Sequence, residues 1–192
     1  MTWLKEIMRQ DREVVCSRRQ FLRAGSGIAA SLLLPAAGFA KAARHKERSL
    51  SFYNTHTDER LKTCYWAEGD YLPEGLKEIN TILRDHRTGD IHDMDRDLVD
   101  ILYLLQNQVE IKQTFQIISG YRSPKTNAML NKKSSGVARR SYHMRGMAID
   151  VRLNGCDLKQ LHKAALSLKA GGVGYYPSSD FIHVDVGRVR QW

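Results

Sequence analysis

Two histidines and one aspartate near the C-terminal end of the sequence form a set that could bind a catalytic metal ion. His143 and Asp150 lie in the segment 141–150, SYHMRGMAID, and His183 lies in the segment 180–185, DFIHVD. Two imidazoles and a carboxylate suit zinc, and three protein ligands leave a fourth coordination position for water. A structural zinc site is closed by four protein ligands, so an incomplete set indicates hydrolysis. A lone strand histidine is more often a hydrogen-bonded structural residue; the combination of three residues carries the prediction.

Two predicted strands can bring these side chains together. The strands cover residues 147–153 and 181–186. Because side chains alternate between the faces of a strand, Asp150 points away from the apolar residues on either side of it. By the same rule His183 and Asp185 share one face of their strand. Gly146 allows a turn between His143 and the first strand, so we expect His143 in a loop beside Asp150.

The rest of the pattern predicts an α+β domain with a central antiparallel sheet and helices on one side. We expect further strands at 49–57, 61–71 and 115–119, the first two forming a hairpin. We expect helices at 73–86, 95–108 and 157–170, a short helix at 123–130, a polar, mobile loop at 131–140, and a tight glycine turn at 171–174.

The N-terminal segment resembles a bacterial twin-arginine export signal. Arg18 and Arg19 precede Phe21 and Leu22, and residues 24–40 are uncharged and rich in small side chains. That run is too short and too rich in glycine for a membrane-spanning helix. We therefore expect residues 1–42 to be a cleaved signal and residues 43–192 to be the mature domain. The twin-arginine export machinery would be a partner, the periplasm the location, and no stable membrane span would remain.

Charge and cysteine content say little about the function of the protein. The chain has a formal charge of +9, of which residues 1–40 contribute +3 (six Lys or Arg less three acids), leaving +6 for the remainder. A basic excess favours an anionic polymer as the binding partner. Nucleic-acid binding is typically marked by a stripe of Lys and Arg with aromatic residues between them, and the sequence has no such stripe, so we expect no nucleic-acid partner. Cys64 and Cys156 could form one disulfide or remain two buried thiols, and both readings stay open.

The motifs resemble those of the zinc D-Ala-D-Ala peptidases, a group that includes VanX-type dipeptidases and the hedgehog-like DD-peptidase fold. The pattern Ser-x-His-x-x-Gly-x-Ala-x-Asp is matched by residues 141–150, and acid-x-x-His by residues 180–183. Gly-Tyr-Arg-Ser at 120–123 matches that group's arginine at a strand end. The resemblance covers roughly the whole mature chain and implies Zn²⁺ held by His143, Asp150 and His183.

The resemblance also implies roles for an acid and an arginine. The acid three residues before the second histidine would serve as general base, and Asp180 occupies that position. Arg122 would stabilise the substrate carbonyl oxygen as it gains negative charge, or else would form only a surface salt bridge. An ideal strand would place Asp180 on the face opposite His183, so its assignment requires a bend at the entry to the strand. Asp185 is the alternative base or a residue that holds an imidazole, and Ser141 is expected to hydrogen-bond within its loop.

Three functions follow from the resemblance. The first is a zinc endopeptidase that cuts peptidoglycan cross-links involving meso-diaminopimelate, of the 4-3 or 3-3 kind. The second is a carboxypeptidase or dipeptidase that trims D-Ala termini. The third is a wall-binding module that keeps the zinc and no longer cleaves, because a fold by itself does not fix a function. An intact ligand trio together with a candidate base favours an enzyme.

Overall fold

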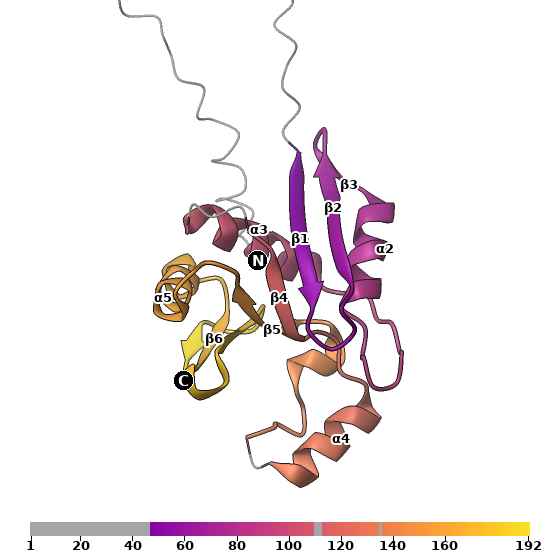
Figure 1. The fold of residues 1–192 in the computed structure, drawn as a ribbon, viewed down its shortest axis with the longest axis vertical. Coiled ribbons are helices and arrows are strands. Elements are labelled where there is room, and N and C mark those ends of the chain that lie inside the picture. Colours follow the sequence, from indigo (N-terminus) through magenta and orange to yellow (C-terminus); the bar gives the residue numbers. More distant parts are fainter. Residues whose placement is uncertain (1–46, 110–112, 135) are drawn as a thin grey trace, which may run out of the picture. The chain divides into compact units, whose positions relative to one another are not determined.

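A large mixed sheet forms the centre of the domain (Figure 1). The computed structural model describes residues 47–109, 113–134 and 136–192, which fall in one compact unit, His45–Trp192; the predicted export signal lies outside them. Eight strands are hydrogen-bonded in the order β3-β2-β1-β4-β5-β7-β6-β8. Their bounds are β1 (Arg48–Asn54), β2 (Arg60–Ala67), β3 (Asp70–Tyr71), β4 (Phe115–Ser119), β5 (Ala148–Leu153), β6 (Gly172–Tyr176), β7 (Phe181–Asp185) and β8 (Arg190–Gln191).

The expectation of an antiparallel sheet is only partly correct. Five strand pairs are antiparallel, but β1 pairs with β4, and β6 with β8, in parallel. β1 and β4 are parallel because the chain between them crosses over through two helices, as a parallel connection requires. β7 lies between β5 and β6, so β8 pairs with the free edge of β6. The chain reverses direction after β7, which is antiparallel to β6, and β8 therefore runs parallel to β6.

The register of the sheet separates an apolar face from a polar one. Phe52 of β1 lies beside Phe115 of β4, Ile117 beside Val151 of β5, and Val151 beside Ile182 of β7. All five side chains are buried and lie on one face. Helices α3 (Arg96–Gln108) and α5 (Leu158–Leu168) pack against each other and against strands on this face, and α2 (Pro73–Ile82) packs on β2. The two helices α3 and α5 thus share one face of the sheet.

Buried polar groups tie β1 and β2 to α3. Asp100 of α3 accepts hydrogen bonds from Tyr65 at 2.9 Å and from Tyr71 at 2.6 Å, and forms an ion pair with Arg48 at 3.2 Å. Asp100 and Arg48 are 3% and 7% exposed. Burial and the neighbouring carboxylate raise the pKa of both tyrosines above its usual range, so the hydroxyls stay protonated as donors. The network is fully paired, which is the condition for burying such charges at low cost.

Helix α4 (Pro124–Lys133) lies beyond the ends of β1 and β4 (Figure 1). It is longer than the predicted 123–130, and Ser123 caps its N-terminus by accepting from the backbone N–H of Thr126. The buried carboxylate of Asp85 accepts from the backbone N–H groups of Ser123 and Arg87, both at 2.9 Å. Burial by itself raises the pKa of Asp85, but these bonds and that of Thr126 outweigh it and hold the pKa well below the usual value. Asp85 therefore fixes the start of α4.

Two predicted elements have different bounds for identifiable reasons. The predicted strand 61–71 is divided into β2 and β3 by a turn at Glu68 and Gly69, both with positive φ. The predicted glycine turn at 171–174 is wrong, because β6 begins at Gly172. A Cβ at Gly174 would lie 2.8 Å from the Trp192 ring, so this glycine permits close packing within a strand rather than a turn.

Candidate metal centre

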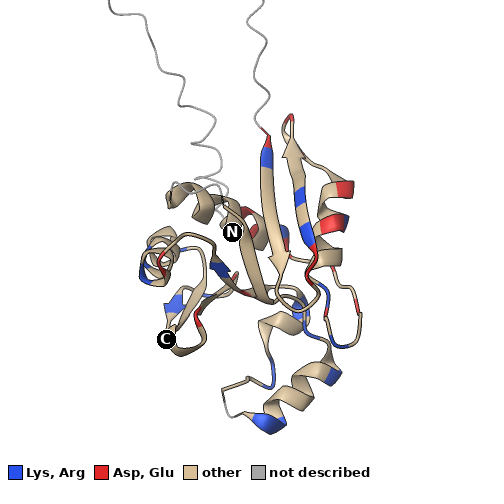
Figure 2. Cartoon of the chain, in the orientation of Figure 1, with Lys and Arg blue, Asp and Glu red and all other residues tan. Residues whose placement is uncertain are grey.

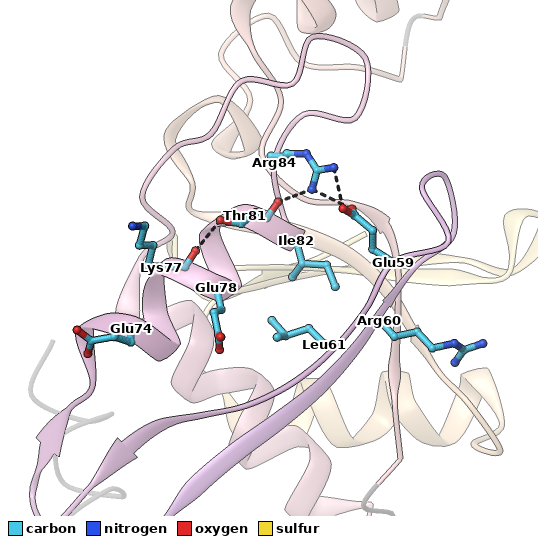
Figure 3. A pocket seen from close by; sticks show the side chains of 9 residues that line it. All are labelled: Glu59, Arg60, Leu61, Glu74, Lys77, Glu78, Thr81, Ile82 and Arg84. Carbon is cyan, nitrogen blue, oxygen red and sulfur yellow. Dashed lines mark hydrogen bonds and ion pairs between the residues drawn. The ribbon is translucent and has the colours of Figure 1, made fainter.

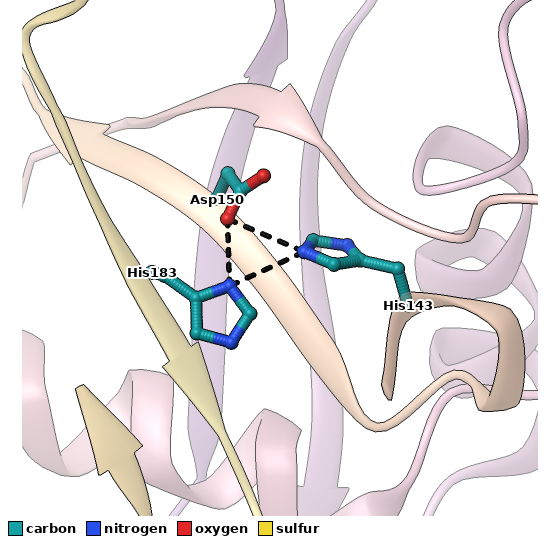
Figure 4. Close-up of side chains that lie close together, drawn as sticks. All are labelled: His143, Asp150 and His183. Atoms are coloured by element: carbon teal, nitrogen blue, oxygen red, sulfur yellow. Dashed lines mark hydrogen bonds and ion pairs between the residues drawn. The ribbon is translucent and has the colours of Figure 1, made fainter. Parts of the chain in front are cut away.

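The three predicted ligands converge on the polar face of the sheet (Figure 4). Asp150 of β5 and His183 of β7 are direct cross-strand partners. His143 comes from a short 3₁₀ helix, η1 (Tyr142–Arg145), immediately before β5. Gly146 ends η1 in the left-handed conformation with φ of 65°, which is the turn that the sequence predicted there. Ligand atoms of the three residues lie within 4.8 Å of one another, and no other such group occurs among the residues that the structure describes.

Hydrogen bonds at the outer edge of each imidazole fix which nitrogen faces the centre. Nδ1 of His143 is 2.8 Å from the carbonyl oxygen of Gly120, and Nε2 of His183 is 3.0 Å from Oδ2 of Asp185. Both partners are acceptors, so these nitrogens carry the protons. The other nitrogens, Nε2 of His143 and Nδ1 of His183, point inward and would supply the lone pairs that a metal ion requires.

Three lone-pair donors thus face one another across short distances. His143 Nε2 is 3.3 Å from His183 Nδ1 and 3.3 Å from Asp150 Oδ1, and His183 Nδ1 is 2.8 Å from the same oxygen. Adjacent donors of a tetrahedral zinc site are separated by roughly 3.3 Å, given bonds of about 2.0–2.1 Å. Lone pairs of imidazoles and a carboxylate at these separations repel unless a proton or a metal ion lies among them. The donor set therefore fits a divalent metal ion in both chemistry and spacing.

The pKa values show the same demand for positive charge. Burial by itself lowers the pKa of His183, but hydrogen bonds and charges from Asp150 and Asp185 outweigh it and raise the pKa to about 9. Burial likewise raises the pKa of Asp150, yet His143 and His183 hold it well below its usual range. In the absence of a metal the site would therefore retain a proton, which a metal ion would displace on binding.

Asp185 holds His183 in place and has no remaining capacity for another partner. Its side chain is 0% exposed. Oδ1 accepts from the backbone N–H groups of Gly172 and Gly187 and from Arg190, while Oδ2 accepts from Arg190 at 2.6 Å and from His183. These contacts lie on the side of the imidazole away from the three-donor centre. Of the two roles that the sequence left open, the geometry favours that of a positioning residue over that of a base.

Asp180 lies at the bend that its assignment required. A short 3₁₀ helix, η2 (Pro177–Ser179), leads into Asp180, whose φ of 52° is left-handed. The carboxylate forms an ion pair at 2.8 Å with Arg152, a residue of β5 that alternates onto the same face as Asp150. Asp180 is largely exposed, with 63% of its side chain accessible. Arg152 therefore holds the carboxylate on the polar face of β5, but Asp180 is not among the residues that line the pocket over the three donors.

Arg122 and Ser141 support the ligands directly. Nη2 of Arg122 lies 3.4 Å from Asp150 Oδ2 and donates to Ser119 at 3.1 Å. Nε of Arg122 is buried and has no hydrogen-bond partner among the described residues. Ser141 caps η1 by accepting from the backbone N–H of His143 at 3.3 Å, a hydrogen bond within its own loop as expected. The arginine thus presents an unsatisfied donor at the site, which is unusual for a buried group.

A pocket of about 460 Å³ opens above the ligands. One wall is the segment between α4 and η1, which Asn127 ties down by donating to the carbonyl oxygens of Ala138 and Arg139 at 3.1 and 3.3 Å. Residues 131–133 of the predicted loop belong to α4, and the described residues after them border the pocket.

The opposite wall consists of residues that the sequence did not single out: Tyr176, Phe181, Arg190 and Trp192. Tyr176 and Phe181 stack at 4.7 Å, and Trp192 lies 5.2 Å from the ring of His183 while donating to the Tyr176 hydroxyl. The one feature of the sequence related to this wall is Gly174, which leaves room for the Trp192 ring.

A second hollow, between α2 and β2, lies outside this centre (Figure 3). Its lining mixes acids and bases around Leu61 and Ile82, and Arg84 closes one side by pairing with Glu59 at 2.9 Å. None of the three predicted ligands lines it. Of the remaining histidines, His56 stacks on His86 and His162 on Tyr175, in ordinary structural contacts. Cys64 and Cys156 are both unpaired.

Positive charge gathers around the entrance to the site. No Asp or Glu occurs in the sequence between Glu110 and Asp150, a stretch that includes α4, η1 and the wall of the pocket. Figure 2 shows basic residues, all of them lysines, at both ends of α4 and no acidic residue along it. No helix in the described part of the chain combines the length and apolar character needed to cross a bilayer.

Comparison with known proteins assigns the class. A family model, Peptidase_M15_2, described as peptidoglycan L,D-endopeptidase MepK, matches residues 42–192, and the chain belongs to this family. Among its relatives are the Escherichia coli (strain K12) peptidoglycan L,D-endopeptidase MepK and the Haemophilus influenzae probable peptidoglycan L,D-endopeptidase MepK. The first is 41% identical over 176 residues, 92% of this chain and 97% of the relative; the second is 42% identical over 178 residues, 92% and 95%. No solved structure matches. The peptidase family predicted from the motifs is confirmed.

Proposed function

We propose that the chain is a zinc-dependent peptidoglycan endopeptidase that hydrolyses cross-links involving meso-diaminopimelate. The observation that carries the proposal is the convergence of three inward-facing donors at the base of a pocket in a chain of this family. The relatives' name specifies a bond between an L- and a D-residue. Of the two kinds of cross-link, the 3-3 kind joins the L-centre carbonyl of one diaminopimelate to the D-centre amine of the next, and we propose it as the substrate.

His143, Asp150 and His183 would hold the zinc ion, which when bound would polarise the scissile carbonyl and lower the pKa of the attacking water. Asp180 would accept the proton from that water and return it to the leaving amine. Its exposed position and its single partner, Arg152, leave the carboxylate free to turn toward the substrate. Arg122 would donate to the carbonyl oxygen as negative charge develops, and its place among the residues that line the pocket supports this role.

We further propose that residues 1–42 are a cleaved twin-arginine signal and that residues 43–192 act in the periplasm. Arg18 and Arg19 before a weakly apolar run support the signal. The lysines of α4 and the lack of acidic residues between Glu110 and Asp150 suit an anionic wall polymer. Periplasmic fractionation of the tagged full-length chain, with the two arginines replaced by lysine as the matched variant, tests this route. Export that is unaffected by the double substitution would contradict it.

Digestion of defined wall fragments tests the activity. Residues 43–192 are purified with zinc, and 3-3 dimers, 4-3 dimers and D-Ala-terminated monomers are incubated with and without a chelator and analysed by mass spectrometry. We expect zinc-dependent cleavage of 3-3 dimers into monomers. Release of D-Ala from monomers alone would instead establish a carboxypeptidase, and zinc-dependent binding without any cleavage would establish a wall-binding module.

A further inference from the structure

Arg140 is a cation at the pocket that has no ion-pair or hydrogen-bond partner among the residues that the structure describes. Three arginines line this pocket, and two of them face carboxylates: Arg122 pairs with Asp150, and Arg190 with Asp185. Arg140 is exposed and forms no ion pair or hydrogen bond with any described side chain. The two paired guanidiniums serve the metal centre. The third is therefore available to an anion that enters the pocket.

The backbone around Arg140 is held in position from both sides. On one side Asn127, 3% exposed, donates to the carbonyl oxygens of Ala138 and Arg139. On the other side Ser141 caps η1, which carries the ligand His143. Arg140 is thus placed beside the reacting centre by two anchors. The neighbouring Arg139 is equally exposed but does not line the pocket, so it offers a matched control.

The proposed substrate carries a suitable anion next to the bond that breaks. In a cross-link through the D-centre amine of diaminopimelate, the carbon that bears the scissile nitrogen also bears a carboxylate outside the main chain. A planar guanidinium can bind a carboxylate through two parallel hydrogen bonds. We propose that Arg140 binds this carboxylate on the leaving side and selects cross-links in which it is free rather than amidated. The inference rests on the proposed endopeptidase function and assigns it a specificity residue.

Steady-state cleavage of matched dimers by the zinc-loaded enzyme tests the inference. The substrates are 3-3 dimers that differ only in a free or amidated D-centre carboxylate. One charge-assisted hydrogen bond corresponds to about tenfold in KM, so wild type should show a KM about tenfold higher for the amidated dimer. Arg140→Gln should raise KM for the free acid about tenfold, leave the amidated dimer unchanged and preserve kcat. Arg139→Gln should behave as wild type.

A binding measurement separates the two proposals. Calorimetric titration of the zinc-loaded protein with the free-acid monomer, the product of cleavage, should show affinity about tenfold weaker in Arg140→Gln than in Arg139→Gln. Weakened binding without cleavage of any dimer would support the Arg140 site and refute the endopeptidase function. Normal cleavage with equal KM and equal product binding in both variants would overturn the role of Arg140. Equal melting temperatures would verify that both variants fold.

Discussion

Replacing Asp185 with asparagine tests whether this carboxylate orients a metal ligand. The two side chains have the same shape, but asparagine exchanges one oxygen for an NH₂ donor. Oδ1 of Asp185 accepts from two backbone N–H groups, at 3.2 Å from Gly172 and 2.8 Å from Gly187, so the amide oxygen is expected to remain there. The amide nitrogen then replaces Oδ2 and faces two donors, Nε2 of His183 and Nη2 of Arg190. The substitution therefore turns an attraction into a repulsion at His183.

The expected loss follows from the burial of this contact. Removing the partner that orients a ligand histidine typically lowers metal affinity about 10- to 100-fold, or about 1.4–2.7 kcal/mol. Asp185 is 0% exposed, so water cannot take the place of the missing acceptor. We therefore expect Asp185→Asn to weaken zinc binding by about 100-fold, the upper end of that range. Arg190 is partly exposed, so its charge can be solvated, and a stability loss of about 1–3 kcal/mol is expected.

Competition with a chromophoric chelator measures the zinc affinity directly. Asp180→Asn is the matched control, because it removes another nearby carboxylate charge that contacts none of the three ligands. Circular dichroism at the temperature of the assay verifies that both variants are folded. Zinc affinity in Asp185→Asn equal to that of wild type would refute the assignment of Asp185 as a positioning residue.

Three further predictions concern the base and the stability of the domain. Asp180→Asn should lower kcat about 10²- to 10⁴-fold while zinc affinity stays within a factor of about two, and unchanged hydrolysis of 3-3 dimers would remove Asp180 from the mechanism. Asp100→Ala should destabilise the domain by about 3–5 kcal/mol in urea unfolding, because the charge of Arg48 is then buried alone; Asp100→Asn keeps acceptors for the tyrosines and should cost less. The pKa of Asp85 is depressed in the folded state, so its contribution to stability is fully present above about pH 5 and is lost as pH falls through the ordinary value of 3.8 toward the lower pKa of the folded state. Urea midpoints should therefore fall from pH 5 to pH 3 more in wild type than in Asp85→Asn, and parallel profiles would contradict this.

Strand alternation was sufficient to predict the ligand pair and insufficient to place the acid. Asp150 and His183 lie in regular strands, so a period of two gives the correct face for each. Asp180 precedes its strand by one residue, where a left-handed backbone conformation breaks the period. A proline and two serines at 177–179 are compatible with such a bend, but no local pattern gives its direction. In the fold the Asp180 carboxylate pairs with Arg152, 28 residues away in the sequence.

The missed parts of the fold depend on contacts that are distant in the sequence. The parallel pairing of β1 with β4 joins residues that are more than 60 positions apart, such as Phe52 and Phe115, and no local periodicity specifies it. The glycines at 172 and 174 suggested a turn, but they leave room for the side chains of Arg190 and Trp192, which come later in the sequence. Arg190 and Trp192 also form part of a wall of the pocket. The wrong prediction of a turn at 171–174 and the failure to predict these two pocket residues therefore have one cause.

The register between β5 and β7 has a consequence for folding. Asp150 and His183 face each other directly across the two strands, and a slip of one residue would carry either side chain to the apolar face beneath the helices. A metal ion bound between them is therefore compatible with one alignment of the two strands only. Its binding energy would count entirely toward the native pairing and against every shifted one. The ion would then stabilise the native alignment of β5 and β7 selectively during assembly of the sheet.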